Sequence, residues 1–413
     1  MRRWCVGQQE RTTSAREASG TGGRFPCFEG IRALAALSVV AFHAVFLTSF
    51  FHTPGGMFLS NLNSAVWVFF VASGFLLYRP FAATHLNSRR AVDLRSYALR
   101  RAARLYPAYW LVLLFFTFVI PRIQYFGTSD IIRTITLTQS YAPVTTNHPG
   151  VFGPFVGGLA PAWSLVVEVT FYAFLPFYAM AIARLARRRE ARRVELGGAA
   201  ALFAIGLVAI IAIASGYTSP WITLLPQHLP AFALGIALAV VSTETWGAGT
   251  LDRIRRWGDP AWVWWGGALV VFLGIPLVGG LRSLEAESGI TLVGAELART
   301  TIGFCIVVPA VIGTQTRGLI RRFLQTRVIV YLGLVSYGIY LWHWFLLRIM
   351  QEDVIGWRLS VGNWVLLVVV TLPVIVFAAS VSWFLVERPI QRAVRSSGPK
   401  IRSVGADSAE TTR

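Results

Sequence analysis

The chain alternates between long apolar stretches and short polar segments that are rich in arginine. Each apolar stretch is close in length to the roughly 20 residues that an α-helix needs to cross the hydrocarbon core of a bilayer. Arg, Pro and Gly residues bound the stretches and indicate where each helix begins and ends. The stretches lie at residues 31–50, 62–81, 104–121, 161–183, 197–214, 221–242, 261–280, 298–313, 328–350 and 362–386. This pattern predicts an all-α polytopic membrane protein with about ten transmembrane helices.

The composition agrees with a membrane protein and removes one alternative. Of the 413 residues, 55% are hydrophobic, and the mean hydropathy is +0.58, which is far above that of a soluble domain. The formal net charge of +19 would suggest a nucleic-acid partner if the protein were soluble. Here the basic residues lie in short segments between apolar stretches, so the positive-inside rule explains them. We therefore expect the lipid bilayer as a partner and no nucleic acid.

The distribution of basic residues predicts the orientation of the spans. With a cytoplasmic N-terminus, the alternating segments place 32 of the 38 Lys and Arg residues inside and six outside. The six are Arg122, Arg133, Arg282, Arg299, Arg348 and Arg358. A missed or additional span would disturb this alternation, because cytoplasmic loops carry the excess of positive charge. We expect both termini in the cytoplasm and a multi-pass protein of the cell (inner or plasma) membrane.

The polar ends of the chain set the expected domain boundaries. Residues 1–24 are polar and lack an apolar core, which predicts a disordered cytoplasmic tail and excludes a signal peptide. Residues 25–392 form the predicted transmembrane domain, and residues 393–413 form a basic cytoplasmic tail. The three cysteines are scattered, so they suggest neither a disulfide framework nor metal-ligand spacing. No metal or bound cofactor is expected.

The first span carries an arginine near one end and a histidine inside it. Ten residues separate Arg32 from His43, so the two side chains lie about 16 Å apart along a helix axis. An ionisable group in hydrocarbon costs at least about 2.5 kcal/mol on insertion scales unless it is paired or faces water. His43 is therefore predicted to be functional. The alternative is a neutral imidazole that binds a neighbouring helix for packing alone.

Other ionisable residues are predicted at the same depth as His43. In the fourth span, Glu168 lies about 10–12 Å below the outer face, and it is the only carboxylate placed within a predicted span. In the ninth span, His343 lies at a similar depth, and His228 lies in the outer half of the sixth. Such a coincidence is unlikely for side chains that face lipid. It suggests a polar chamber open to the outside.

The predicted cytoplasmic boundary carries several arginines. Arg32 shares this boundary with the segment RSYALRRAARLYP, which supplies Arg95, Arg100, Arg101 and Arg104. Guanidinium groups bind phosphate in a bidentate manner, and several together form a receptor for a polyanion. The alternative is that topology alone places arginines there.

Seven motifs, in order, resemble the acyltransferase-3 family of integral membrane acyltransferases. They are FEGIRALAALSVVAFHAVF at 28–46, FFVASGFLL at 69–77, RAARLYPAYW at 101–110, WSLVVEVTFYAFLP at 163–176, LPAFALGIALA at 229–239, SYGIYLWH at 336–343 and VERP at 386–389. The resemblance covers residues 25–392. It implies an O-acyltransferase that moves an acyl group, usually acetyl, from cytoplasmic acyl-CoA to a hydroxyl of an extracytoplasmic acceptor. The acceptor classes are a cell-envelope glycolipid or saccharide, a lipid or a natural product, and acyl-CoA (acetyl-CoA) is a co-substrate.

The resemblance also assigns residues. Arg32 and His43 match the arginine and histidine of the family's core signature, Arg101 and Arg104 match its RxxR pattern, and Glu168 matches its intramembrane glutamate. Ser73, Gly74 and Phe75 match the SGF turn. The family usually has Asp before the Gly that precedes the arginine motif, and this chain has Glu29 there. Glutamate keeps the charge but adds a methylene, so the family's close contact at this position is not assigned to Glu29.

These residues suggest a mechanism as a hypothesis. Imidazole can deprotonate a hydroxyl or hold an acyl group, so His43 is the expected base or nucleophile. Glu168 is expected to orient it, as a carboxylate does for a catalytic histidine. Arg32, Arg101 and Arg104 would bind the phosphates of acyl-CoA. His343, Tyr337 and Ser73 are candidates for acceptor binding or oxyanion stabilisation.

Two other classes of function stay open from the sequence. Intramembrane His and Glu also form proton relays, so a proton-coupled transporter of a small metabolite is the main alternative. The absence of matching halves and the single intramembrane carboxylate disfavour it. A non-catalytic membrane partner is the third possibility, and it predicts that His43 is dispensable.

Overall fold

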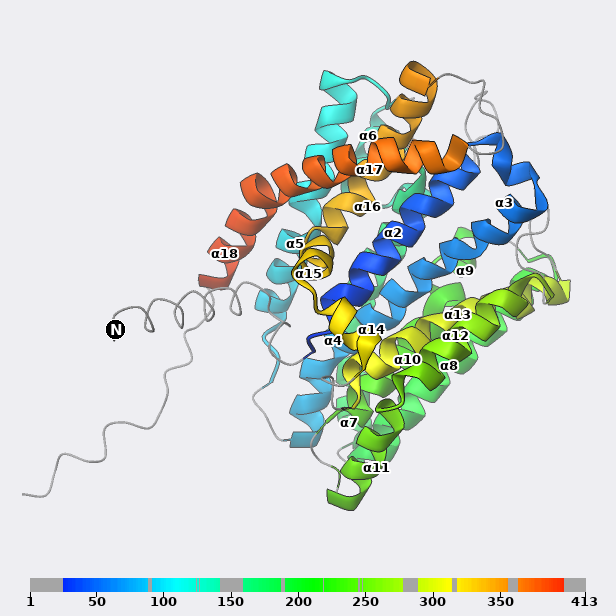
Figure 1. Ribbon diagram of the computed structural model, residues 1–413. Coiled ribbons are helices and arrows are strands. Elements are labelled where there is room, and N and C mark those ends of the chain that lie inside the picture. The colour runs from blue at the N-terminus through cyan, green and yellow to red at the C-terminus, as the bar shows by residue number, and fades with distance from the viewer. Residues whose placement is uncertain are drawn as a thin grey trace, which may run out of the picture.

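The computed structural model describes residues 25–87, 91–123, 125, 127–141, 159–186, 190–217, 219–243, 246, 248–277, 289–313, 318–355 and 363–396. Across these residues the chain is helical and contains no strand (Figure 1). Eight helical segments are long and apolar enough to cross a membrane, and two bent pairs raise the number to ten. The predicted all-α polytopic membrane fold with about ten spans is confirmed. The cytoplasmic location of the termini stays a prediction.

The spans follow the chain with short connections. The straight spans are built on α2 (Phe28–Phe46), α4 (Ala65–Asn87), α5 (Leu94–Leu114, continued by a π-helical turn at Phe115–Val119), α7 (Trp163–Ala186), α8 (Ala191–Ala214), α10 (Leu225–Val241), α13 (Gly289–Val311) and α17 (Asn363–Ser382). The bent pairs are α11 (Ala248–Gly258) with α12 (Ala261–Gly274), at 49°, and α15 (Arg327–Leu334) with α16 (Ser336–Ile349), at 71°. A final helix, α18, covers Arg388–Ser396.

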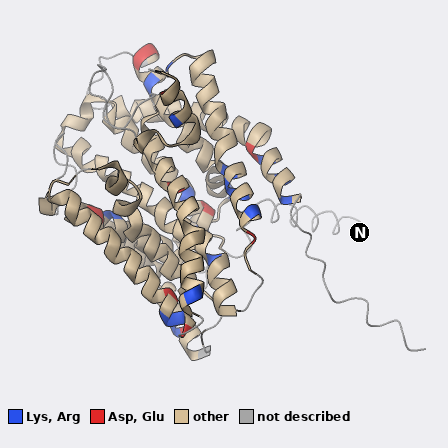
Figure 2. Ribbon diagram, turned by 180° about the vertical axis from the view of Figure 1, so that it is seen from behind, with Lys and Arg blue, Asp and Glu red and all other residues tan. Residues whose placement is uncertain are grey.

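Several helices begin earlier than the hydropathy pattern predicts. Helix α8 begins at Ala191 and α13 at Gly289, so Glu195, Glu296 and Arg299 lie within helices of the bundle, and all three are buried. The expectation that Glu168 is the only intramembrane carboxylate is therefore wrong. Buried charge is tolerated there because each group has a partner, such as the 3.3 Å ion pair between Arg299 and Glu296. Figure 2 shows charged positions mainly towards the helix ends, with a few in the interior.

The tail boundaries fall partly outside the described residues. Residues 1–24 and 397–413 belong to the predicted tails and are not described. The predicted boundary between residues 392 and 393 falls inside α18, which continues to Ser396.

Three helices form the centre of the bundle. Helices α2, α4 and α10 are mostly buried, whereas α8 and α17 expose most of their surface to the surroundings. Helix α2 packs against α4 on one side and against α15, α16 and α17 on the other, as Figure 1 shows. Alanines at 33, 35, 36 and 44 line the buried faces of α2 and permit close approach. The bend between α15 and α16 brings α16 alongside α2.

The contact between α4 and α10 depends on two glycines. A Cβ added at Gly74 would lie 2.3 Å from the carbonyl oxygen of Phe232, and one added at Gly235 would lie 2.2 Å from the carbonyl oxygen of Val71. Each glycine therefore lies against the backbone of the other helix. This is the use of small residues that membrane helix pairs commonly make.

We predict that Gly235→Ala destabilises the bundle in detergent by about 1–3 kcal/mol, because the added methyl group overpacks a backbone contact. The measurement is the thermal unfolding midpoint, followed by circular dichroism or intrinsic fluorescence. Gly266→Ala on α12 is the matched control, since nothing lies within 4 Å of a Cβ at that position. Equal midpoints for the two variants would show that the α4–α10 contact can relax without cost.

Candidate active site

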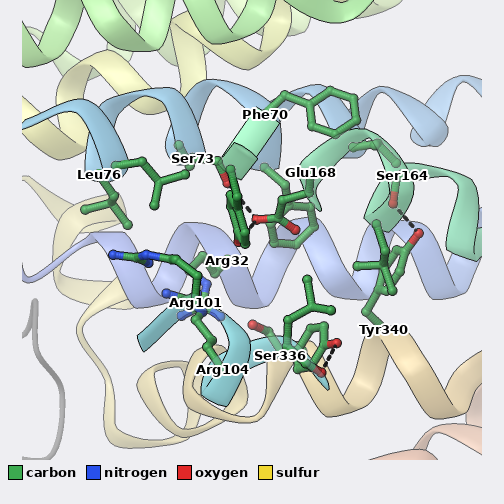
Figure 3. A pocket seen from close by; sticks show the side chains of 18 of the residues that line it. Arg32, Phe70, Ser73, Leu76, Arg101, Arg104, Ser164, Glu168, Ser336 and Tyr340 are labelled. Carbon is green, nitrogen blue, oxygen red and sulfur yellow. Dashed lines mark hydrogen bonds between the residues drawn. The ribbon is translucent and has the colours of Figure 1, made fainter. Parts of the chain in front are cut away.

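A pocket of about 80 Å³ lies at the centre of the bundle, between α2, α4, α5, α7 and α16. Its polar lining residues are Arg32, Ser73, Arg101, Arg104, Ser164, Glu168, Tyr172, Ser336, Tyr337 and Tyr340. Figure 3 shows the arginines towards one end of the pocket, Ser164 and Tyr340 towards the other, and Glu168 between them. Six of the eight residues singled out from the sequence line this pocket. The other two, His43 and His343, contact each other beyond the end marked by Tyr340.

The arginine end of the pocket is built from α2 and α5. Arg32 forms a 2.9 Å ion pair with Glu29 on the same helix, which gives the atypical glutamate of the signature a close contact. Arg101 and Arg104 lie one turn apart on α5 and point to the same pocket. Within the described part of the chain, neither of these two forms a hydrogen bond or an ion pair with a carboxylate. Because their guanidinium groups are not engaged by a direct ion pair, this end suits a polyanion.

Helix α5 begins with a side-chain cap that fixes where these arginines lie. The carboxylate of Asp93 accepts hydrogen bonds from the backbone amides of Arg95 and Ser96, at 3.1 and 3.3 Å. The Ser96 hydroxyl donates a third, at 2.5 Å, which lowers the pKa of Asp93 below its ordinary value. At the other side of the pocket, the Tyr337 hydroxyl donates to the Leu105 carbonyl at 2.8 Å. Tyr337 thus joins α16 to α5 one residue beyond Arg104.

Glu168 has different partners from those expected. Its Oε1 atom accepts hydrogen bonds from the Ser73 hydroxyl at 3.0 Å and from the Tyr172 hydroxyl at 2.5 Å. Among the described residues it forms no hydrogen bond with His43. The expected role of Glu168 in orienting His43 therefore lacks its contact. Depth along two helices gives a common layer, but it does not give the direction in which each side chain points.

His43 is instead hydrogen-bonded to His343. Its Nδ1 atom lies 3.1 Å from Nε2 of His343 and 3.0 Å from the carbonyl oxygen of Val39. The Nδ1 atom of His343 lies 2.6 Å from the carbonyl oxygen of Tyr340. His343 is fully buried, and Trp344 packs edge-on against the His43 ring, with 5.2 Å between the ring centroids.

These contacts determine the tautomers of the neutral pair. A carbonyl oxygen can only accept, so Nδ1 of His343 carries its proton and its Nε2 presents a lone pair. Nδ1 of His43 then donates to that lone pair and to the Val39 carbonyl. The Nε2 atom of His43 is left unprotonated, which is the form needed in a base or a nucleophile.

Four polar pocket residues were not singled out from the sequence, and three of them form side-chain hydrogen bonds. Ser164 and Tyr340 are joined by a 2.7 Å hydrogen bond, and Tyr340 also donates to the Pro161 carbonyl at 2.5 Å. The third is Tyr172, one turn beyond Glu168 on α7. The signal was present, since the quoted motifs at 163–176 and 336–343 contain all three. Only the tertiary structure, which brings Ser164 to Tyr340 and places Tyr172 at the pocket, distinguishes them from their neighbours.

His228, expected in the same polar layer, lies elsewhere. Its ring is surrounded by those of Trp67, Phe70 and Trp163, with centroid separations of 5.1–5.5 Å, and it does not line the pocket. Among the described residues, no group of three or more His, Cys, Asp and Glu side chains is placed to hold a metal ion.

The fold and the site define a multi-pass membrane protein with a buried pocket that has an arginine end, and with two contacting histidines beyond its other end. The model of the acyltransferase-3 family, described as an acyltransferase domain, matches residues 25–383. The chain belongs to this family of membrane acyltransferases.

Two curated relatives extend over most of the chain. The chain is 27% identical over 358 residues to acyltransferase MdmB of Streptomyces mycarofaciens, and the alignment covers 79% of each protein. The chain is also 23% identical over 382 residues to O-acetyltransferase OatA of Staphylococcus aureus. That alignment covers 89% of this chain and 57% of the relative. A shorter match, 28% over 159 residues, covers 37% of this chain and 24% of peptidoglycan O-acetyltransferase OatA of Listeria monocytogenes. No solved structure matches the chain.

The arginine end predicts polyanion binding that depends on two side chains of α5. We expect inorganic pyrophosphate to raise the unfolding midpoint of the detergent-solubilised protein. Arg101→Gln and Arg104→Gln should each weaken its Kd roughly tenfold or more, since a charged hydrogen bond contributes about 1.5–3 kcal/mol. Arg100→Gln is the matched control, because Arg100 lies on the same helix, is exposed and does not line the pocket. An equal loss of pyrophosphate affinity in all three variants would indicate unspecific attraction to a basic surface.

Proposed function

We propose that this protein transfers an acetyl group from cytoplasmic acetyl-CoA to a hydroxyl of an extracytoplasmic saccharide or glycolipid. The observation that carries the proposal is a pocket with three arginines at one end and Tyr340 at the other, beyond which His43 and His343 are in contact. An acyl-CoA has a matching layout. Its phosphates lie at one end, and a long thin pantetheine arm carries the thioester at the other.

The dimensions support this placement. Arg32 and His43 share α2, and the ten residues between them separate the two side chains by about 16 Å along the axis. Arg32, Arg101 and Arg104 would hold the phosphates, and the thioester would extend along the pocket towards Tyr340. The orientation of the spans predicted from the basic residues puts the arginine end at the cytoplasmic face, where acyl-CoA is found.

In the proposed reaction, His43 acts as a general base. Its free Nε2 takes the proton of the acceptor hydroxyl, and the oxygen attacks the thioester carbonyl. The tetrahedral intermediate collapses with cleavage of the carbon–sulfur bond, and the imidazolium returns the proton to the sulfur of CoA. His343 accepts the hydrogen bond from Nδ1 of His43 throughout, so it orients the base as a carboxylate does in other triads.

Glu168 takes a different role from the one first assigned to it. It fixes the hydroxyls of Ser73 and Tyr172 in the wall between the arginine end and the imidazole end. A carboxylate beside three guanidinium groups also reduces their mutual repulsion while the pocket is empty. We propose that Glu168 organises the middle of the channel through which the pantetheine arm passes.

The names of the relatives support the acceptor class. One is called a peptidoglycan O-acetyltransferase and another an O-acetyltransferase, so their printed names describe acetyl transfer to oxygen. A hydroxyl on a cell-envelope saccharide or glycolipid is the corresponding proposal for this chain.

The first test uses right-side-out vesicles loaded with radiolabelled acetyl-CoA. We expect label to appear in external saccharide or lipid, and we expect His43→Ala to lower the rate by about 10²–10⁴-fold, the usual contribution of a general base. His52→Ala is the control, since His52 is exposed and lies on the short helix after α2. A solute flux without consumption of acetyl-CoA would support the proton-coupled transporter, and an active His43→Ala variant would support the non-catalytic partner.

The second test concerns His343 as a positioning residue. His343→Ala should lower kcat about tenfold or more, while the KM for acetyl-CoA stays close to the native value, because the arginine end is untouched. His343→Gln should recover part of kcat, since its amide oxygen can accept the hydrogen bond from Nδ1 of His43. If the role of His343 were purely structural, kcat would fall equally in both variants and the amount of folded protein would change. That result would contradict the orienting contact.

A further inference from the structure

A second and larger pocket lies beside the arginine end. It has a volume of about 540 Å³ and is formed by the end of α4, the start of α5 and the end of α7. Its lining is mainly apolar, with Thr84 and His85 as the polar contributions from α4. Phe81 of α4, Leu94 of α5 and Ala183 of α7 also line it. The volume falls within the roughly 300–1,000 Å³ that is typical of small-molecule sites.

A carboxylate behind the pocket orients its histidine. Glu195 on α8 is fully buried and accepts hydrogen bonds from Nδ1 of His85, at 2.6 Å, and from the Tyr78 hydroxyl. Because Nδ1 is used in this way, the Nε2 atom is the part of His85 that is left for a ligand. A buried acid that fixes one histidine of a pocket wall is an uncommon feature for a surface that only packs against lipid.

Only one layer of aromatic side chains separates this pocket from the arginine end. Phe81 lines the second pocket and packs edge-on against Tyr97, with 5.8 Å between the ring centroids. The guanidinium of Arg101 lies 5.8 Å from the centre of the Tyr97 ring. The Tyr97 hydroxyl donates at 3.2 Å to the carbonyl of Tyr172, which lines the first pocket.

The distance between the two pockets is short along α5. Leu94 lines the second pocket and Arg101 lines the first, and Arg101 comes seven positions after Leu94, which corresponds to about 10 Å of helix. If the phosphates of a ligand lie at the arginines, a nucleoside attached to those phosphates is long enough to reach the second pocket.

We infer that the second pocket binds the adenine nucleoside end of acyl-CoA, with His85 facing the base and Tyr97 in the wall between the base and the phosphates. This inference rests on the proposed function, since it extends the same donor molecule beyond the arginine end. An adenine ring is a flat, largely apolar surface with nitrogen donors and acceptors on its edge. Apolar walls with one oriented imidazole nitrogen match that chemistry.

A binding experiment tests the inference without relying on transfer. Adenosine 3′,5′-bisphosphate, the nucleotide half of CoA, is titrated into the detergent-solubilised full chain by calorimetry. Ala183→Phe fills the second pocket and should weaken Kd at least tenfold. Ala173→Phe is the matched control, because Ala173 is exposed on the same helix and lines neither pocket. His85→Gln, whose amide can still donate to Glu195, should weaken Kd about fivefold and provides a milder variant if Ala183→Phe does not fold.

A kinetic comparison separates this inference from the proposed function. With acetyl-CoA as donor, Ala183→Phe should raise KM at least tenfold, whereas kcat/KM for acetyl-pantetheine, which lacks the nucleotide, should not change. If native protein transfers acetyl from neither donor, the proposed function fails, and the calorimetric result still decides whether the pocket binds the nucleotide. Equal effects on both donors, or unchanged Kd and KM in Ala183→Phe, would overturn the inference. Displacement of bound lysophospholipid, but no binding of the nucleotide, would assign the pocket to lipid instead.

Discussion

The absence of water from the hydrocarbon layer obliges each polar group of this bundle to find a partner inside the protein. Most buried charges satisfy that constraint locally. Arg321, for example, donates to the carbonyls of Asp259, Gly258 and Pro309 at 2.7–3.1 Å, so its charge helps to hold helix ends together. Against this background, two arginines of α5 that lack a carboxylate partner in the described chain stand out. Because neither forms a direct ion pair, their guanidinium groups are left to bind an anionic ligand.

The same constraint explains why two histidines meet at the opposite end of the site. An imidazole can donate from one nitrogen and accept at the other, so two neutral rings satisfy each other without a buried net charge. The contact between His43 and His343 needs α16 to lie alongside α2, and the 71° bend between α15 and α16 places it there. A carboxylate in the same position would add the cost of desolvating a full charge. The imidazole partner therefore orients His43 at a lower electrostatic cost.

Between these ends, the pocket wall is held by hydrogen bonds that join different helices. Ser73 links α4 to α7 through Glu168, and Tyr337 links α16 to α5 through the Leu105 carbonyl. The packing of α4 against α10 through Gly74 and Gly235 positions α4, and hence Ser73, from behind. The positions of the reactive groups therefore depend on tight contacts some distance from them, as sites on rigid elements usually do.

The sequence by itself determined the number of spans, the family and the spacing of Arg32 and His43, because hydropathy and helical rise are properties of one segment at a time. It also identified Arg101 and Arg104 as a pair, since they lie within one turn of a single helix. The tertiary structure decided that His43 bonds to His343 and that Glu168 bonds to Ser73 and Tyr172. It also decided that Glu195 lies in the bundle beside His85. These pairings depend on which face of each helix meets which neighbour, and that follows from packing between segments far apart in the chain, which no single span contains.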